Sequence, residues 1–201
     1  MTEETLEWLS RADKTLARLI KKVGPCTLKP RNRSPFESLV RSVAYQQLNG
    51  TAAATILGRV RALYPERRFP RPEDILATAD EKLRGAGLSR AKVAAIKDIA
   101  AKTIEGLVPN RRGISKMTEI EIIERLTTVR GVGPWTVEML LIFTLGRTDV
   151  LPVTDYGVRK GFALTYEWKE LPKPKELLEF GERWRPHRTT AAWYFWRALD
   201  Q

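Results

Sequence analysis

The 201-residue chain predicts an all-α fold, and three features of the sequence support this expectation. Apolar residues recur at intervals of three and four over most of the chain, which is the spacing of one helix face. Ser34 with Glu37, and Thr118 with Glu121, show the spacing of a capping box at a helix start. Alternating apolar and polar runs, which indicate half-buried strands, are nearly absent.

Loops rich in Pro, Gly and charged residues divide the first half of the chain into helices. A basic loop is expected at residues 29–33, and Ser34 with Glu37 forms the capping box of the helix that follows it. Ser89 is expected to cap a long helix that ends at Gly106. The helices expected here span residues 3–22, 34–47, 51–64 and 89–106, and a further short helix follows the Pro-rich turn at 70–72.

A helix is also expected to begin at Thr118, because Thr118 and Glu121 form the second capping box. Its apolar face is assigned to Ile120, Ile123 and Leu126. The segment Arg130-Gly131-Val132-Gly133 ends this helix, and Pro134 occupies the position that a helix prefers for its first residue. The C-terminal third adds helices near 156–165, 174–183 and 187–199.

The turn between these two helices is a candidate phosphate-binding hairpin. Gly131 and Gly133 would let the backbone approach a phosphate closely, and N–H groups at a helix N-terminus attract an anion. Such a contact would not depend on base sequence. Backbone carbonyls on the other side of the turn can hold a monovalent cation. The alternative is an ordinary helical hairpin with a glycine stop.

Composition agrees with a polyanionic partner. The chain has 35 Lys and Arg against 24 Asp and Glu, a formal charge of +11, although a solvated surface of interspersed charges is the alternative. A single cysteine, Cys26, excludes an intrachain disulfide and any four-cysteine zinc or iron–sulfur site. The longest apolar run, from Met139 to Gly146, is too short to span a membrane. We therefore expect a monomer in a reducing, cytoplasmic compartment.

The segment LTTVRGVGPWTVEMLLIF followed by DVLPVTDYGV resembles the helix-hairpin-helix motif and trailing catalytic Asp of base-excision DNA glycosylases, in particular the 3-methyladenine DNA glycosylase II type. Further matching segments cover most of residues 34–199. The resemblance implies two helical lobes with an active-site cleft between them. Residues 34–147 would form the lobe with the hairpin, and residues 1–33 plus 148–201 the lobe with Asp155.

The resemblance implies hydrolysis of the bond between a damaged base and C1′ of its sugar. Asp155 would stabilise the cationic sugar of the transition state, although this residue taken alone is more readily explained as a helix cap. Trp135 stands where bifunctional relatives carry a Schiff-base lysine, and neither Lys92 nor Lys160 matches that nucleophile. The expected product is therefore an abasic site in an uncut strand.

Further site residues follow from the same resemblance. A bulky apolar side chain, Leu48, would enter the base stack when the damaged nucleotide is extruded. Aromatic walls would hold a positively charged alkylated purine by cation–π stacking. The base pocket is assigned to Trp135, Tyr156, Trp196 and Met139, where Met139 replaces an aromatic residue of some relatives. Double-stranded DNA containing alkylated bases would contact Gly131, Gly133, Thr136, Gln47, Leu48 and Asn49.

No cofactor is expected to be required, beyond a possible Na⁺ or K⁺ on the hairpin carbonyls of Thr127, Val129 and Val132. Two other functions stay open. A non-catalytic DNA-binding module would use the same hairpin while Asp155 only caps a helix. A glycosylase for mismatched or oxidised bases would keep the fold and change the pocket.

Overall fold

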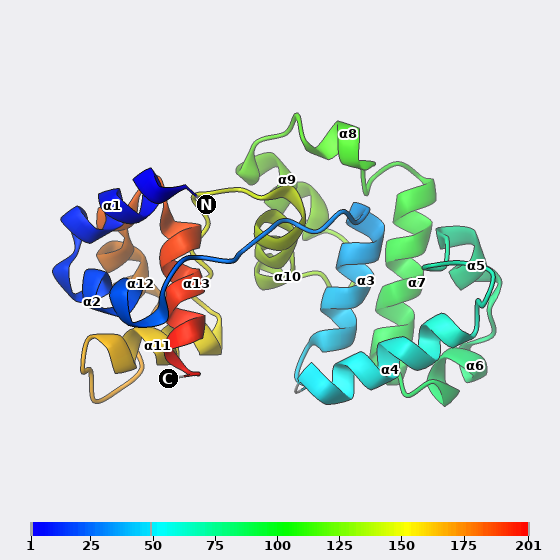
Figure 1. Ribbon diagram of the computed structural model, residues 1–201. Coiled ribbons are helices and arrows are strands. Elements are labelled where there is room, and N and C mark those ends of the chain that lie inside the picture. Colours follow the sequence, from blue (N-terminus) through cyan, green and yellow to red (C-terminus); the bar gives the residue numbers. More distant parts are fainter. Residues whose placement is uncertain (1, 49, 201) are drawn as a thin grey trace. The chain divides into compact units, whose positions relative to one another are not determined.

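The computed structural model describes residues 2–48 and 50–200 of the chain. Every regular element in these ranges is a helix, which confirms the predicted all-α class (Figure 1). The chain divides into two compact units, Met1–Arg31 with Leu141–Gln201 and Asn32–Leu140. No helix in the described ranges is long and apolar enough to cross a membrane.

The first unit joins the two ends of the chain. Its core consists of apolar and aromatic side chains from the central helix α13 and the helices packed around it. Gly161 lets α11 and α13 touch backbone to backbone, because a Cβ atom there would lie only 1.9 Å from the carbonyl oxygen of Phe195. The elements are α1 (Glu3–Ala12), α2 (Lys14–Val23), the π-helical turn η1 (Leu141–Leu145), α11 (Tyr156–Thr165), α12 (Pro174–Phe180), the 3₁₀ turn η2 (Gly181–Trp184) and α13 (Arg188–Ala198).

The expected single helix over residues 3–22 is wrong, because the chain breaks at Asp13. The Asp13 carboxylate caps α2 by accepting bonds from the N–H groups of Thr15 and Leu16, both at 3.0 Å. Its other oxygen accepts the Tyr166 hydroxyl at 2.6 Å and the Trp184 indole N–H at 3.0 Å. Burial raises the pKa of Asp13, but these hydrogen bonds together outweigh it and hold the pKa below its ordinary value.

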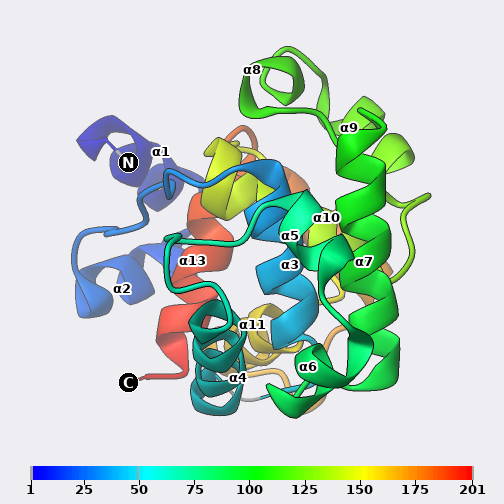
Figure 2. The ribbon, with the colours of Figure 1, turned by 90° about the vertical axis from the view of Figure 1, so that its right-hand side faces the viewer.

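The second unit is built around α7. Helices α3 and α5 pack against it, with α6 also in contact, as Figure 2 shows from the side of this unit. Ser89 caps α7 and Gly106 follows its end, both as predicted. The short helices α6 and α8 were not expected from the sequence. The elements are α3 (Pro35–Tyr45), α4 (Gly50–Ala62), α5 (Pro72–Ala77), α6 (Asp80–Gly85), α7 (Arg90–Ile104), α8 (Arg111–Ile114), α9 (Glu119–Leu126) and α10 (Pro134–Leu140).

Two local predictions in this unit need correction. The Ser34 hydroxyl does cap α3, but the Glu37 carboxylate pairs with Arg41 at 2.9 Å instead of completing a capping box. The Thr118–Glu121 capping box of α9 is confirmed, whereas the buried face of this helix consists of other residues than predicted. Ile120 is 69% exposed, and Ile122 is the residue buried with Leu126, which lies one turn further along the same face.

Candidate active site and nucleic-acid interface

The hairpin between α9 and α10 rests on α7. Gly131 has φ +75°, in the left-handed region that glycine adopts without strain, and a Cβ atom there would lie 2.6 Å from the Cβ atom of Ala95. The N–H group of Arg130 donates to the Asp98 carboxylate at 2.8 Å. Gly131 is thus required both by its backbone conformation and by its close packing on α7. Gly133 has open space at its Cβ position.

Gln46, at the end of α3, ties this hairpin to the preceding part of the chain. Its side-chain amide donates to the carbonyl of Gly131 and to the Thr136 hydroxyl, both at 3.0 Å. Thr136 as a whole residue is only 1% exposed. Its contact with DNA stays a prediction. Sequence reasoning missed Gln46, since its partners lie 85 and 90 residues away.

The wedge loop, defined here as residues 45–48, presents Leu48 to solvent. Leu48 is 39% exposed, which argues against a core role and agrees with the predicted insertion into a base stack. Gln47 has φ +56°, an uncommon conformation for a residue with a side chain. Lys92 donates from Nζ to the carbonyls of Ala44 and Gln46, both at 2.9 Å. Asn49, the third residue predicted here, lies outside the described residues.

Asp155 precedes α11 and is held by two donors. Its Oδ1 atom accepts the N–H group of Val158 and the indole N–H of Trp196, each at 2.8 Å. The first bond is a helix N-cap, so the capping that the sequence allowed does occur. The second bond comes from α13, a different helix. Gly157 leaves room for it, because a Cβ atom at that position would lie 2.9 Å from the Trp196 ring.

The opposite end of α13 fixes the segment that leads to Asp155. The Thr189 hydroxyl accepts the N–H group of Val150 at 2.9 Å and donates to the carbonyl of Arg147 at 2.8 Å. Arg188 donates to the Asp149 carboxylate at 2.7 Å and is itself buried. One helix therefore holds both this loop and the carboxylate. The sequence carried no local signal for these contacts, which join residues about forty positions apart.

The predicted base-pocket residues divide between the two units. In the first unit, Trp196 stacks on Phe143 with ring centres 5.5 Å apart, and Tyr156 is 62% exposed. In the second unit, Trp135 is partly buried on α10 and Met139 is buried at 9% exposure. A common pocket formed by these four side chains stays a prediction.

The carbonyl groups assigned to a cation lie where α9 passes into the hairpin. The carbonyl oxygen of Val129 accepts the N–H group of Val132 at 3.1 Å, which closes the turn. Both valines are buried as whole residues, at 2% exposure for Val129 and 4% for Val132. Carbonyl oxygens are hard donors that fit Na⁺ or K⁺. Binding of a cation by Thr127, Val129 and Val132 stays a prediction.

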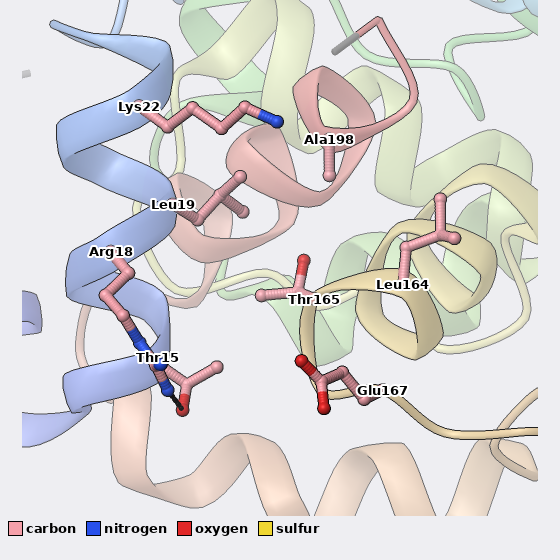
Figure 3. A pocket seen from close by; sticks show the side chains of 8 residues that line it. All are labelled: Thr15, Arg18, Leu19, Lys22, Leu164, Thr165, Glu167 and Ala198. Atoms are coloured by element: carbon pink, nitrogen blue, oxygen red, sulfur yellow. Dashed lines mark hydrogen bonds between the residues drawn. The ribbon is translucent and has the colours of Figure 1, made fainter.

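A separate hollow of about 390 Å³ lies on the first unit between α2 and α11, beside the end of α13 (Figure 3). Arg18 donates to the Thr15 hydroxyl at 3.2 Å on one side, and Glu167 lies on the other. The hollow is lined by none of the predicted site residues. Its aliphatic, cationic and acidic side chains form no group of catalytic type, so Asp155 remains the candidate catalytic centre.

The family model and the relatives that match this chain all belong to DNA base excision repair. Residues 40–186 match the family described as HhH-GPD superfamily base excision DNA repair protein. DNA-3-methyladenine glycosylase 1 of Schizosaccharomyces pombe is 41% identical over 94% of this chain and 84% of its own length. The alkylbase DNA glycosidase-like protein mag2 of the same yeast is 34% identical over 94% of this chain and 90% of its own.

A solved structure, that of the S. pombe 3-methyladenine DNA glycosylase Mag1 in complex with abasic DNA, superposes with a TM-score of 0.93. It is 38% identical and covers 98% of this chain and 97% of its own.

Proposed function

Because the chain belongs to the HhH-GPD superfamily of base excision DNA repair proteins, we propose that it is a DNA glycosylase that releases alkylated purines such as 3-methyladenine and 7-methylguanine. The relatives named for 3-methyladenine and alkylbase excision support this substrate class. The bond between Asp155 and the indole of Trp196 is the observation that carries the proposal. A residue that served only to cap α11 would need no donor from a second helix.

The Asp155 carboxylate supplies the chemistry in this proposal. When the glycosidic bond breaks, positive charge develops on the sugar, and a fixed negative charge beside it lowers the barrier. Trp196 and the N–H group of Val158 hold Oδ1 in one place. An N-alkylated purine is already a good leaving group because it carries positive charge. One carboxylate can therefore act without a dedicated general acid.

Recognition of the base would rest on aromatic faces. A cationic purine is attracted to the electron-rich face of an indole or phenol ring. Trp135, Tyr156 and Trp196 supply such faces, and Met139 adds a polarisable thioether. The hairpin glycines would bind phosphate without reading sequence, with or without a bound Na⁺ or K⁺. We further propose that the protein acts on double-stranded DNA as a monomer.

We propose that the enzyme has no lyase activity. Trp135 occupies the position at which bifunctional relatives carry the nucleophilic lysine. The ammonium of Lys92 is engaged by two backbone carbonyls, and the ammonium of Lys160 lies 5.9 Å from the centre of the Tyr156 ring. Neither geometry resembles a free amine beside a sugar, so strand cleavage through a Schiff base is not expected.

The test is to incubate the protein with methylated duplex DNA and to identify the products. Free 3-methyladenine or 7-methylguanine should appear by chromatography, and the strand should break only after later heat or alkali. Strand cleavage during the reaction, together with a covalent protein–DNA adduct formed when borohydride reduces a Schiff base, would contradict the monofunctional assignment. Tight duplex binding with no release from methylated, mismatched or oxidised DNA would favour a non-catalytic binding module.

A further inference from the structure

One face of α7 contacts both of the predicted DNA-contacting loops. Lys92, Ala95 and Asp98 follow one another at intervals of three, so they lie along the same side of the helix. Lys92 binds one carbonyl just before the wedge loop and one within it, and Ala95 and Asp98 support the hairpin at Gly131 and Arg130. The same rigid helix therefore positions Leu48 and the phosphate-binding glycines.

Gln46 closes this arrangement from the other side. Its backbone carbonyl accepts Lys92 Nζ at 2.9 Å, while its side-chain amide reaches the Gly131 carbonyl and the Thr136 hydroxyl. A single residue thus joins α7, the end of α3 and the hairpin. We call the contacts of Lys92 and Gln46 the brace.

The brace lies next to a backbone that needs support. Gln47, directly after Gln46, has φ +56°, and such a conformation persists only where surrounding contacts hold it. The carbonyls at the end of α3 lack helical partners and carry the negative end of the helix dipole, so a lysine ammonium is a favourable partner for them. Lys92 therefore holds the backbone that leads into Leu48.

We propose that Lys92 and Gln46 are positioning residues that keep Leu48 in register with the phosphate-binding hairpin. This inference rests on the proposed glycosylase function. The hairpin sets the position of the protein on the duplex through phosphate, and the wedge must then enter the stack beside one particular nucleotide. Base extrusion costs free energy, and a mobile wedge would recover less of it.

The experiment compares Lys92→Met with Lys102→Met, a matched control on the same helix. Lys102 pairs with Glu105 at the helix end and makes none of the contacts that define the brace, so its removal changes the charge equally without touching them. Three quantities are measured on folded protein: hydrogen exchange of residues 44–48, the single-turnover rate of base release, and the salt dependence of binding to undamaged duplex. Gln46→Ala and the double variant with Lys92→Met complete a mutant cycle.

For Lys92→Met, we expect faster exchange of the amides of Gln46 and Leu48 and release slowed by about tenfold to a hundredfold. Duplex affinity and its salt slope should stay native, and the effects of the two brace variants should not add. The Lys102→Met control should match the native protein in all three measurements. Lys92→Arg, which can still donate to both carbonyls, should recover most of the release rate.

Two results would overturn the inference. Native exchange together with a native release rate would show that the brace positions nothing. A salt slope reduced by about 0.9 would make Lys92 a direct phosphate contact instead. If the native protein released no base, the proposed function would fail, while the exchange measurement would still decide whether Lys92 orders the wedge loop.

Discussion

Replacing Gly157 with Ala tests whether Trp196 has to hold Asp155 for base release. The added Cβ atom would lie 2.9 Å from Cδ1 and 3.2 Å from Nε1 of Trp196, and 3.1 Å from Oδ1 of Asp155. Ordinary contacts begin near 3.4 Å, so the indole must move by about half an ångström. Because Cδ1 is bonded to Nε1, this shift also displaces the N–H donor, so the 2.8 Å hydrogen bond to Asp155 should lengthen and weaken.

The expected magnitude follows from the kind of hydrogen bond. A bond from a neutral donor to a carboxylate contributes about 1.5–3 kcal/mol, and about 1.4 kcal/mol corresponds to tenfold in rate. If the whole contribution serves to orient the carboxylate, base release should slow by about tenfold to a hundredfold. Stability should change little, because alanine is favoured over glycine in a helix by about 0.5–1 kcal/mol, which offsets part of the crowding.

The assay is single-turnover release of 7-methylguanine, with thermal unfolding measured in parallel. Gly58→Ala is the matched control, since Gly58 lies in α4 and a Cβ atom there meets nothing within 4 Å. That control should release base at the native rate and be slightly more stable. A Gly157→Ala protein that releases base at the native rate would refute the view that Trp196 orients Asp155.

Three further predictions concern the hairpin, the wedge and the core. Gly131→Val should weaken binding to any duplex, because a side chain there would clash with Ala95 and the positive φ is strained for valine. An unchanged binding curve would remove the hairpin from the interface. Leu48→Ala should reduce 2-aminopurine fluorescence beside a lesion with little loss of duplex affinity; undiminished fluorescence would contradict the wedge assignment. Asp13→Ala should cost on the order of 3 kcal/mol in a urea melt, since it leaves the Trp184 indole and the α2 N-terminus without their acceptor. The pKa of Asp13 is lowered in the folded protein, so its contribution to the free energy of unfolding is present above the unfolded pKa of about 3.9 and is lost as pH falls further. The difference in stability between native protein and variant should therefore close in acid. A difference that does not depend on pH would contradict this account.

Local sequence signals predicted the starts of α3, α7 and α9, where a Ser or Thr caps the first turn. The Thr118–Glu121 box and the Ser89 cap depend on atoms three residues apart, so the sequence alone is sufficient to locate them. The break at Asp13 was missed because its cause is distant: Tyr166 and Trp184 draw the carboxylate into the core from more than 150 residues away. No Gly or Pro marks this break.

In the candidate site, too, local patterns could be read from the sequence and long-range contacts could not. Gly131 and Asp155 were proposed because they belong to a pattern of fixed order along the chain, and Leu48 because its segment resembles the wedge region of the glycosylases. The contacts that position them were not predicted. Gln46 and Trp196 act through hydrogen bonds to residues that are distant in the sequence, and nothing in their neighbouring residues indicates those partners. The fold is needed to identify such supporting residues.

The most direct test of the central claim is to compare base release and duplex binding by native protein and by Asp155→Asn. Asparagine caps a helix as well as aspartate does, and its oxygen can still accept the N–H groups of Val158 and Trp196. The substitution therefore removes the negative charge and little else. We predict native duplex affinity with release slowed by about a thousandfold or more. Release at the native rate would contradict the claim that the Asp155 carboxylate carries the reaction.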